Sequence, residues 1–164
     1  MEDNLNFINE KVYAMCGFTL SSYKKETEGN EYAACRFQLS KWDIIYRNAK
    51  ITPKKTGQFV TFWKRNENGI TEPFSNKDLF DFYVVTVSAN DTMGQFVFPK
   101  NILLNKGIIS TPKKEGKRGF RVYPPWDTTT NKQAVKTQQW QLDYFYEITP
   151  TTDFKKVTEL FSVV

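Results

Sequence analysis

Hydrophobic residues recur at helical spacing near both ends of the chain and alternate with polar residues between them. One set predicts an amphipathic helix over 3–16: Leu5, Ile8, Val12 and Met15. A second helix is predicted over 131–141, after a threonine run that can cap it, and a short last helix follows Pro150. The segment 142–148 fits a continued helix or a strand equally well.

Alternating or β-branched apolar residues predict the strands between these helices. The expected strands are 31–40, 43–50, 58–65, 81–89, 94–99 and 120–123. The polar stretch 18–30 is predicted to be a loop, and Gly, Pro and Asn predict turns over 52–57 and 66–69. Helical turns are expected over 76–80 and 100–106. The pattern predicts a single α+β domain over 1–164, with a mixed central β-sheet flanked by helices.

Length and composition agree with one packed domain. The chain has 164 residues, of which 40% are hydrophobic and 16% aromatic, which is enough for a core and argues against disorder. No secretory pattern opens the chain, and its apolar runs are too short to cross a bilayer. With only Cys16 and Cys35 as cysteines, we expect a cytoplasmic protein with reduced thiols and no membrane partner.

The net charge of +5 is modest, but the basic residues are concentrated in two segments. Segment 44–66 has six basic residues and no acidic residue, and segment 100–121 has seven against Glu115. The rest of the chain is net acidic. This asymmetry predicts one positive surface, which suits a polyanionic partner.

Aromatic residues are interleaved with these cations, as expected of a groove that binds nucleic acid. The residues predicted to contact phosphates are Arg47, Lys50, Lys54, Lys55, Lys64, Lys117, Arg118 and Arg121. The residues predicted to stack on bases are Tyr123, Trp126 and Trp63. The alternative is that the aromatic residues belong to the core and that the lysines keep a sheet edge soluble. Gln138, Gln139 and Gln141 are candidates to read base edges, although a solvated helix face explains them as well.

Several strings resemble the MepB family, which is named after a protein encoded beside a staphylococcal multidrug efflux pump and its repressor. They are FQLSKWDIIYRNAKITPKKTGQFVTFWKR, PFSNKDLFDFYVV, GQFVFPKNILLNKGIIS, GKRGFRVYPPWD and KQAVKTQQWQLDYF. The resemblance implies a bacterial cytosolic protein and does not imply drug binding. The strings DFYVV and GQFVFPKNIL also resemble a late strand pair of restriction-endonuclease-like folds, which implies a fold of that kind by analogy only.

Catalytic chemistry has little support in the sequence. The chain has no histidine, which excludes serine–histidine and cysteine–histidine hydrolases. A metal-dependent nuclease needs converging carboxylates, usually with a lysine two residues after the later one. Phe62 occupies that position before Lys64, and the scattered candidates are Glu31, Asp43 and Asp81. We therefore expect no catalytic residue, no metal and no cofactor.

The function predicted from these observations is non-enzymatic binding of nucleic acid in a basic, aromatic-lined groove, with DNA favoured over RNA. Two alternatives stay open. One is a metal-dependent nuclease that uses the scattered carboxylates. The other is a pocket for a single nucleoside or nucleotide, formed by Tyr123, Trp126 and the loop 117–121.

Overall fold

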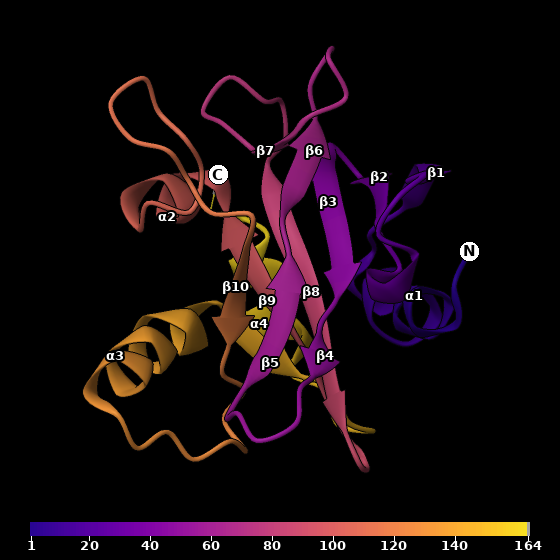
Figure 1. Ribbon diagram of the computed structural model, residues 1–164. Helices are drawn as coiled ribbons and strands as arrows, with labels where there is room; N and C mark the ends of the chain where they lie inside the picture. The colour runs from indigo at the N-terminus through magenta and orange to yellow at the C-terminus, as the bar shows by residue number, and fades with distance from the viewer. Residues whose placement is uncertain (164) are drawn as a thin grey trace.

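The computed structural model describes residues 1–163 and has a six-stranded mixed sheet at its centre (Figure 1). In spatial order the strands are β1 (Leu20–Lys25), β2 (Cys35–Leu39), β3 (Trp42–Asn48), β8 (Phe82–Ala89), β9 (Thr92–Pro99) and β11 (Phe145–Glu147). Neighbouring strands are antiparallel except for β3 and β8, which are parallel. The predicted α+β class, with a mixed sheet flanked by helices, is confirmed.

Two small sheets complete the β-structure. One has the order β10 (Gly119–Val122), β5 (Gln58–Thr61) and β4 (Lys50–Ile51), and in the other β6 (Trp63–Arg65) pairs with β7 (Thr71–Pro73). In Figure 1, β5 and β10 lie across one face of the large sheet. Alternate residues of this ribbon point inward because side chains alternate along a strand, and so Val60, Phe120 and Val122 are buried.

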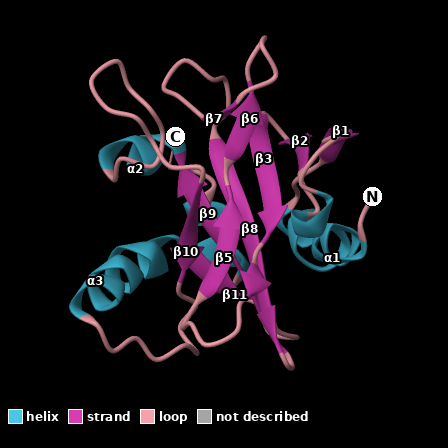
Figure 2. Ribbon diagram, in the orientation of Figure 1, coloured by secondary structure: helices cyan, strands magenta, loops and turns pink. Residues whose placement is uncertain are grey.

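Helices pack around the central sheet and cover the parts of it that the other strands leave uncovered (Figure 2). The helix predicted over 3–16 is confirmed, as α1 (Asp3–Ile8) continues through a π-helical segment, Asn9–Tyr13, and a 3-10 turn, Ala14–Cys16. The others are α2 (Lys100–Asn105), α3 (Lys132–Gln141) and α4 (Phe154–Leu160). None of the helices in residues 1–163 combines the length and the apolar character that a membrane span requires.

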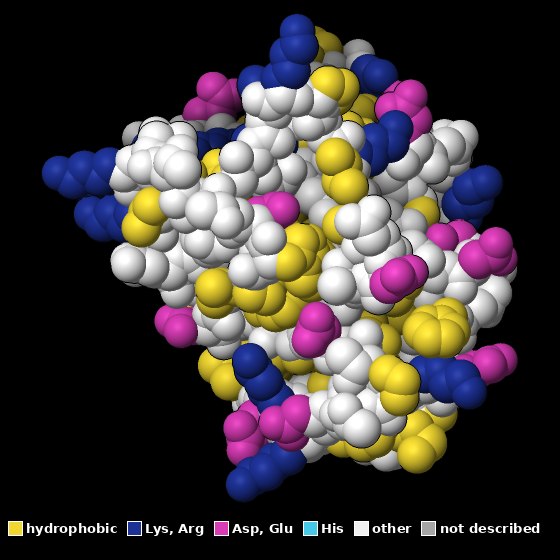
Figure 3. All heavy atoms as spheres, turned by 90° about the horizontal axis from the view of Figure 1, so that it is seen from below, with side chains coloured by type: hydrophobic (Ala, Val, Ile, Leu, Met, Phe, Trp, Pro, Cys, Tyr) yellow, Lys and Arg dark blue, Asp and Glu magenta, His cyan; other side chains and the backbone are white. Residues whose placement is uncertain are grey.

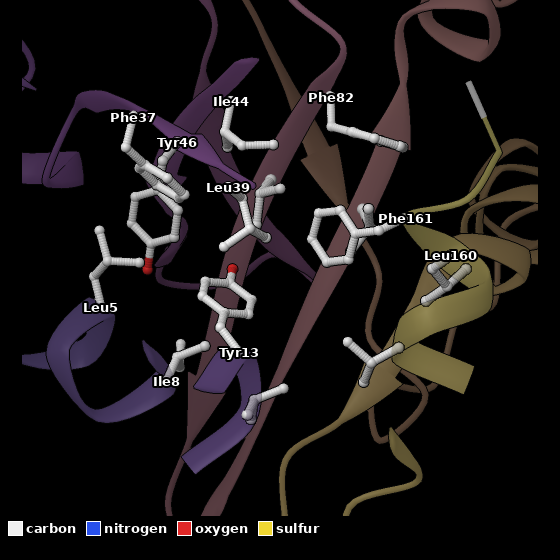
Figure 4. Packing of buried hydrophobic residues seen from close by; sticks show 14 of the residues in the cluster. Leu5, Ile8, Tyr13, Phe37, Leu39, Ile44, Tyr46, Phe82, Leu160 and Phe161 are labelled. Carbon is white, nitrogen blue, oxygen red and sulfur yellow. The ribbon is translucent and has the colours of Figure 1, made fainter. Parts of the chain in front are cut away.

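The first helix and α4 cover one face of the large sheet (Figure 4). Leu5, Ile8 and Tyr13 point from the helix toward the sheet, and Phe161 packs edge-on against Phe82 with ring centroids 5.2 Å apart. Both cysteines are free thiols, as expected. Side chains alternate along each strand, so the residues between those buried on this face point to the opposite face.

The opposite face packs against the β5–β10 ribbon, α2 and α3. Ile45, Tyr83 and Val85 of the sheet contact this second core, where the Phe62 and Tyr83 rings stack at 4.0 Å. Arg47 shares the face of Ile45, because the two residues are two positions apart on β3. The strand that positions Arg47 therefore directs its side chain inward, under the second layer.

Some predicted elements were wrong. Segment 18–30 contains edge strand β1, and residues 30–32 form a 3-10 turn instead of beginning the next strand. The strand predicted over 58–65 is divided at Phe62 into β5 and β6, because its two halves pair with different partners. Strand β7 was not predicted. The ambiguous segment 142–148 forms a 3-10 turn, Leu142–Tyr144, followed by β11.

Candidate functional site

The residues predicted to form one basic groove line two separate pockets. Arg47, Lys64 and Trp63 line one pocket, which we call the arginine pocket. Lys117, Arg121 and Tyr123 line the other, which we call the lysine–aromatic pocket, and none of residues 1–163 lines both. The remaining predicted residues line neither pocket: Lys50, Lys54, Lys55, Arg118 and Trp126. The charge concentrated in the sequence is thus distributed over two places in the fold.

The arginine pocket is a cavity of about 330 Å³ between the large sheet and the β6–β7 hairpin. Its charged and aromatic lining residues are Glu26, Glu28, Arg36, Arg47, Trp63, Lys64, Arg65, Phe74 and Asp78. They come from β2, β3 and β6, from the loop after β1 and from the turn after β7. A buried cation at the floor and paired cations at the wall distinguish this pocket.

Arg47 is the buried cation, with 5% of its surface exposed. Its Nη1 donates a hydrogen bond of 2.8 Å to the carbonyl oxygen of Tyr46. Among residues 1–163, no carboxylate lies within 4 Å of its guanidinium. Its charge acts to lower the pKa values of Cys35 and Tyr83, although burial of these two groups outweighs it and both pKa values are raised. Arg47 is therefore a charge inside the fold that lacks a counter-charge.

Arg36 is the second cation of this pocket that forms no ion pair within the described chain. It lies on β2 directly opposite Ile45, and so its side chain shares the face of Arg47. Its Nη2 donates a hydrogen bond of 2.7 Å to the carbonyl oxygen of Leu79. The sequence analysis missed Arg36, because its position beside Arg47 depends on the pairing register of β2 and β3.

Some cations of the first basic segment, unlike Arg47, lie close to carboxylates from elsewhere in the chain and are partly neutralised by them. Lys64 lies 2.7 Å from Asp78 and 3.5 Å from Glu72. Burial acts to lower the pKa of Lys64, but its bonds to these carboxylates outweigh burial and raise that pKa. The remaining pairs are Arg65 with Glu28 at 2.7 Å, Lys50 with Glu31 at 3.1 Å and, from the second segment, Arg118 with Glu115 at 3.1 Å. These four cations have less capacity for a polyanion than their number in the sequence suggests.

The lysine–aromatic pocket has a volume of about 340 Å³ and lies between β10 and α3. Its cationic and aromatic residues are Lys106, Lys117, Phe120, Arg121, Tyr123 and Trp140. None of its lining residues in the described part of the chain is acidic. The Lys106 ammonium lies 5.5 Å from the centroid of the Trp140 ring, within the range of a cation–π contact. Sequence analysis missed Lys106 and Trp140 as a pair, because α2 and α3 bring them together from distant segments.

Arg121 holds the basic turn 52–57 against β10. Its Nε donates to the Thr56 carbonyl at 3.0 Å, and its Nη2 donates to Thr52 Oγ1 at 2.8 Å and to the Gly57 carbonyl at 3.1 Å. Asp127 is near enough for Arg121 to lower its pKa, although burial is the larger effect and the pKa is raised. Arg121 therefore positions the turn that carries Lys54 and Lys55, in addition to lining the pocket.

The aromatic residues predicted to stack on bases have different environments. Tyr123 is half-buried over Gly57, where an added Cβ would lie 2.6 Å from its ring. Trp63 is half-buried, with the Arg65 guanidinium 5.6 Å from its ring centroid. Trp126 packs edge-on against Phe145 at 5.9 Å, and its Nε1 is buried without a hydrogen-bond partner in the described structure. Tyr123 and Trp63 face pockets, whereas Trp126 contacts the core.

Two of the glutamines proposed to read bases are occupied by the protein itself. Gln141 is fully buried; its Oε1 accepts from the Tyr123 amide at 2.8 Å, and its Nε2 donates to the Arg121 carbonyl at 2.9 Å. The Gln138 amide donates to the carbonyl oxygens of Pro124 and Asp127. Both residues therefore anchor the segment after β10 on α3, and base reading by them is not supported.

The scattered carboxylates do not come together. Asp43 and Asp81 are neighbours at the start of β3 and β8, where Asp81 Oδ2 accepts from the Asp43 amide at 2.8 Å. Glu31 is paired with Lys50, beyond the other end of β3. Within the described chain, no group of three or more His, Cys, Asp or Glu side chains is placed to hold a metal ion.

A third cavity, of about 860 Å³, has a different character. Most of its apolar lining comes from the first helix, β9, the segment before α4 and the first residue of α4: Phe7, Met15, Met93, Ile148, Pro150 and Phe154. Figure 3 shows hydrophobic side chains at the surface of the face seen from below, where lysine and arginine side chains project at the rim without forming one continuous patch. The mainly apolar lining of this cavity, which has Glu10 and Asp91 against Lys11, does not suit a polyanion.

Comparison with known proteins identifies relatives by sequence and by structure. The MepB-like family model matches residues 26–147. The crystal structure of MepB superposes with a TM-score of 0.78 at 33% identity, over 91% of this chain and 99% of that one. A bacterial homing endonuclease superposes with a TM-score of 0.43 at 14% identity, over 79% of this chain and 81% of that one, and this likeness carries no argument about activity. No curated protein sequence matches the chain.

Proposed function

This chain belongs to the MepB-like family, and we propose that it binds nucleic acid, DNA in particular, without cleaving it. The lysine–aromatic pocket carries the proposal. Lys106, Lys117 and Arg121 line it together with Tyr123 and Trp140, and its lining has no described carboxylate. Cations without local counter-charges attract phosphates, and aromatic faces attract bases, so the two kinds of contact coincide in one place.

The shape of the pocket favours an unpaired nucleotide over a base in a duplex. Trp140 and Tyr123 are both half-buried, so a base must leave a helical stack to reach them. Stacking of one base on an aromatic side chain is worth roughly 1–3 kcal/mol. We therefore expect single-stranded DNA to bind more tightly than a duplex of the same length.

The basic turn 52–57 extends this surface. Lys54 and Lys55 are exposed, and Arg121 ties their turn to the strand that lines the pocket. By contrast, Lys50, Lys64 and Arg118 would have to exchange a carboxylate for a phosphate. These three residues are therefore weaker candidates than the two lysines of the turn.

The proposal is tested by fluorescence anisotropy with a labelled oligonucleotide at low salt. Lys117→Met, which removes an exposed cation of the pocket, is expected to weaken binding by about tenfold, or roughly 1.4 kcal/mol. Lys136→Met is the matched control, because it removes an equal charge from an exposed position of α3 outside both pockets. Trp140→Leu is expected to weaken single-strand binding more than duplex binding.

Two results would overturn the proposal. The first is equal affinity of the Lys117→Met variant and the Lys136→Met control, or no binding at all at low salt. The second is cleavage of the DNA in the presence of Mg²⁺ or Mn²⁺ that an Asp81→Asn variant loses. The second result would establish the metal-dependent nuclease instead.

A single nucleotide is the second candidate ligand for the same pocket. The cavity of about 340 Å³ lies at the small end of the range for ligand pockets, roughly 300–1,000 Å³. Asn131, Gln133 and Thr137 add hydrogen-bonding groups to its lining. Calorimetry with mononucleotides separates the two candidates, because saturable binding of a mononucleotide without oligonucleotide binding would favour the second.

A further inference from the structure

Ligand binding in the lysine–aromatic pocket does not explain the buried Arg47 of the arginine pocket. Arg47 is 5% exposed and has no carboxylate within 4 Å in the described structure. Removing a charged group from water is costly unless a partner compensates it. A buried guanidinium without a counter-charge indicates that the partner is a ligand.

The unused donors of Arg47 face the cavity. A guanidinium has five N–H groups, and Arg47 uses one in its bond to the Tyr46 carbonyl. Arg47 lines the pocket, and none of its side-chain nitrogens is both fully buried and without a hydrogen-bond partner within the described chain. The free N–H groups therefore reach the cavity surface, where a planar fork suits two oxygens of one oxyanion.

Arg36 adds a second set of donors beside the first. It lies on the neighbouring strand and on the same face, and its bond to the Leu79 carbonyl leaves most of its N–H groups free. Two adjacent arginines favour a doubly charged group over a singly charged one. A terminal phosphate monoester carries about −1.5 to −2 charges at neutral pH, whereas a phosphodiester inside a strand carries one.

The remaining lining residues set the charge of the pocket. Glu28 and Asp78 are bound by Arg65 and Lys64, and Glu26 is the third acidic residue of the lining. The four cations of the lining exceed its three carboxylates by one, so the empty pocket is net positive. An anion that enters the pocket meets Arg36 and Arg47, because these two cations form no ion pair with a carboxylate in the described chain.

The depth of Arg47 in the arginine pocket determines which kind of phosphate can reach it. Arg47 lies under the second layer of the fold, at the floor of a cavity of about 330 Å³. A phosphate inside a strand has a nucleotide on both sides and cannot be brought to such a floor without burying both. A terminal phosphate has a nucleotide on one side only, and Trp63 in the pocket wall offers a ring for that nucleotide.

We propose that the arginine pocket binds the terminal phosphate of a nucleic-acid strand through Arg47 and Arg36, so that this protein recognises phosphorylated ends. The inference rests on the proposed function, because it supplies the end specificity of a nucleic-acid-binding protein. The shared chemistry is a phosphate monoester dianion, which inorganic phosphate imitates.

The experiment compares one oligonucleotide of about 12 nucleotides with a 5′-phosphate, with a 3′-phosphate and with hydroxyl ends. A hydroxyl-ended strand that is one nucleotide longer controls for the added charge. We expect one phosphorylated form to bind about tenfold more tightly than both hydroxyl-ended strands. Arg47→Met and Arg36→Met are expected to remove this preference, whereas Lys136→Met keeps it.

Arg47→Lys keeps the charge but loses the fork, so it is expected to retain less than half of the preference. This variant keeps the test decisive should Arg47→Met fail to fold. Equal binding of phosphorylated and hydroxyl-ended strands by the unmodified protein would overturn the inference and leave the proposed function intact.

Absence of binding to every strand would overturn the proposed function instead. Calorimetry with inorganic phosphate then decides about the pocket itself. Saturable binding that Arg47→Met abolishes would retain the anion site but not its nucleic-acid ligand, and would overturn end recognition. No phosphate binding would overturn the anion site as well.

Discussion

At Arg47, the proposed phosphate binding and the stability of the fold oppose each other. Its charge is buried without a counter-charge in the described structure, and its unused donors face the cavity. Replacement of a buried charge by an apolar side chain of similar volume is often neutral or stabilising. If the proposed binding holds, Arg47 is a position where function costs folding free energy.

We expect Arg47→Met to raise the free energy of unfolding by about 1 kcal/mol in urea denaturation, at unchanged dependence on urea concentration. Arg65→Met serves as the comparison, because Arg65 lines the same pocket but is paired with Glu28 at 2.7 Å. It is expected to lower stability slightly or not at all, since its pair is exposed. A clear loss of stability in Arg47→Met would show that the charge is compensated within the fold.

Cys35 links stability to alkaline pH. Burial raises the pKa of its thiol to about 12, from an ordinary value near 9. Between these values the unfolded chain releases the proton and the folded chain keeps it, so the free energy of unfolding falls as pH rises. The buried tyrosines Tyr13 and Tyr146, whose pKa values burial also raises, add to this loss at higher pH.

Cys35→Ala isolates the contribution of the thiol. It lowers stability at pH 8 by removing a packed side chain, but its stability is expected to fall less steeply between pH 9 and 11, by about 1 kcal/mol per pH unit. Urea unfolding of both proteins at several pH values measures the two slopes. Parallel slopes would mean that Cys35 ionises in the folded chain as readily as in the unfolded one.

The site was predictable from the sequence only in part, and the reason lies in pairing. Alternation along a strand over 43–50 is enough to place Arg47 on the face of Ile45. The neutralising carboxylates Glu28 and Asp78 could not be assigned, because they come from a loop and a turn that the sequence does not connect to the strands. The clustering of cations along the sequence therefore overestimated the net positive charge at any one place in the fold.

At the scale of elements, strands were predicted where one face is buried and missed where neither is. Strand β1 has no fully buried residue, so its sequence lacks the alternation by which strands are recognised. Strand β7 has three residues, and only its last is buried. The division of 58–65 into β5 and β6 depends on partners at 119–122 and 71–73, which no local pattern specifies.

Strand β11 depends on one glycine of its neighbour. Gly94 of β9 lies opposite Glu147, and a Cβ there would lie 2.3 Å from Phe145 Cζ and 2.7 Å from the Tyr146 carbonyl oxygen. Gly94→Ala is therefore expected to displace β11 and to lower the free energy of unfolding by about 2 kcal/mol or more. Thermal unfolding measures the effect.

Gly69 provides the control for this substitution. It has a φ of +74° and nothing within 4 Å of an added Cβ, so Gly69→Ala costs only backbone strain, about 1 kcal/mol. A loss in Gly94→Ala no greater than that in Gly69→Ala would show that β9 and β11 accommodate the added methyl group with little displacement.

At the scale of the whole molecule, ion pairing limits how strongly salt affects the proposed binding. Four cations of the two basic segments have carboxylate partners, and the lysine–aromatic pocket offers Lys106, Lys117 and Arg121. With the turn lysines this makes about five phosphate contacts, for which a single strand gives a slope of log K against log salt near −3.5.

Titrations at several salt concentrations measure this slope. Lys117→Met is expected to reduce its magnitude by about 0.7, the value of one contact on a single strand. A slope near −6 would mean that the four paired cations also exchange their carboxylates for phosphates. A slope near zero would contradict a polyanion ligand altogether.

The β5–β10 ribbon also determines when the lysine–aromatic pocket forms during folding. Thr61 pairs with Gly119, and the Phe62 amide donates to the Arg118 carbonyl, so the ribbon closes a long loop of the chain. Contacts between residues far apart in sequence form slowly, because loop closure must precede them. On a ribosome, the ribbon cannot close before residue 119 has emerged. A nascent chain therefore lacks the lysine–aromatic pocket until its last third arrives, whereas the residues that line the arginine pocket, between 26 and 78, emerge earlier.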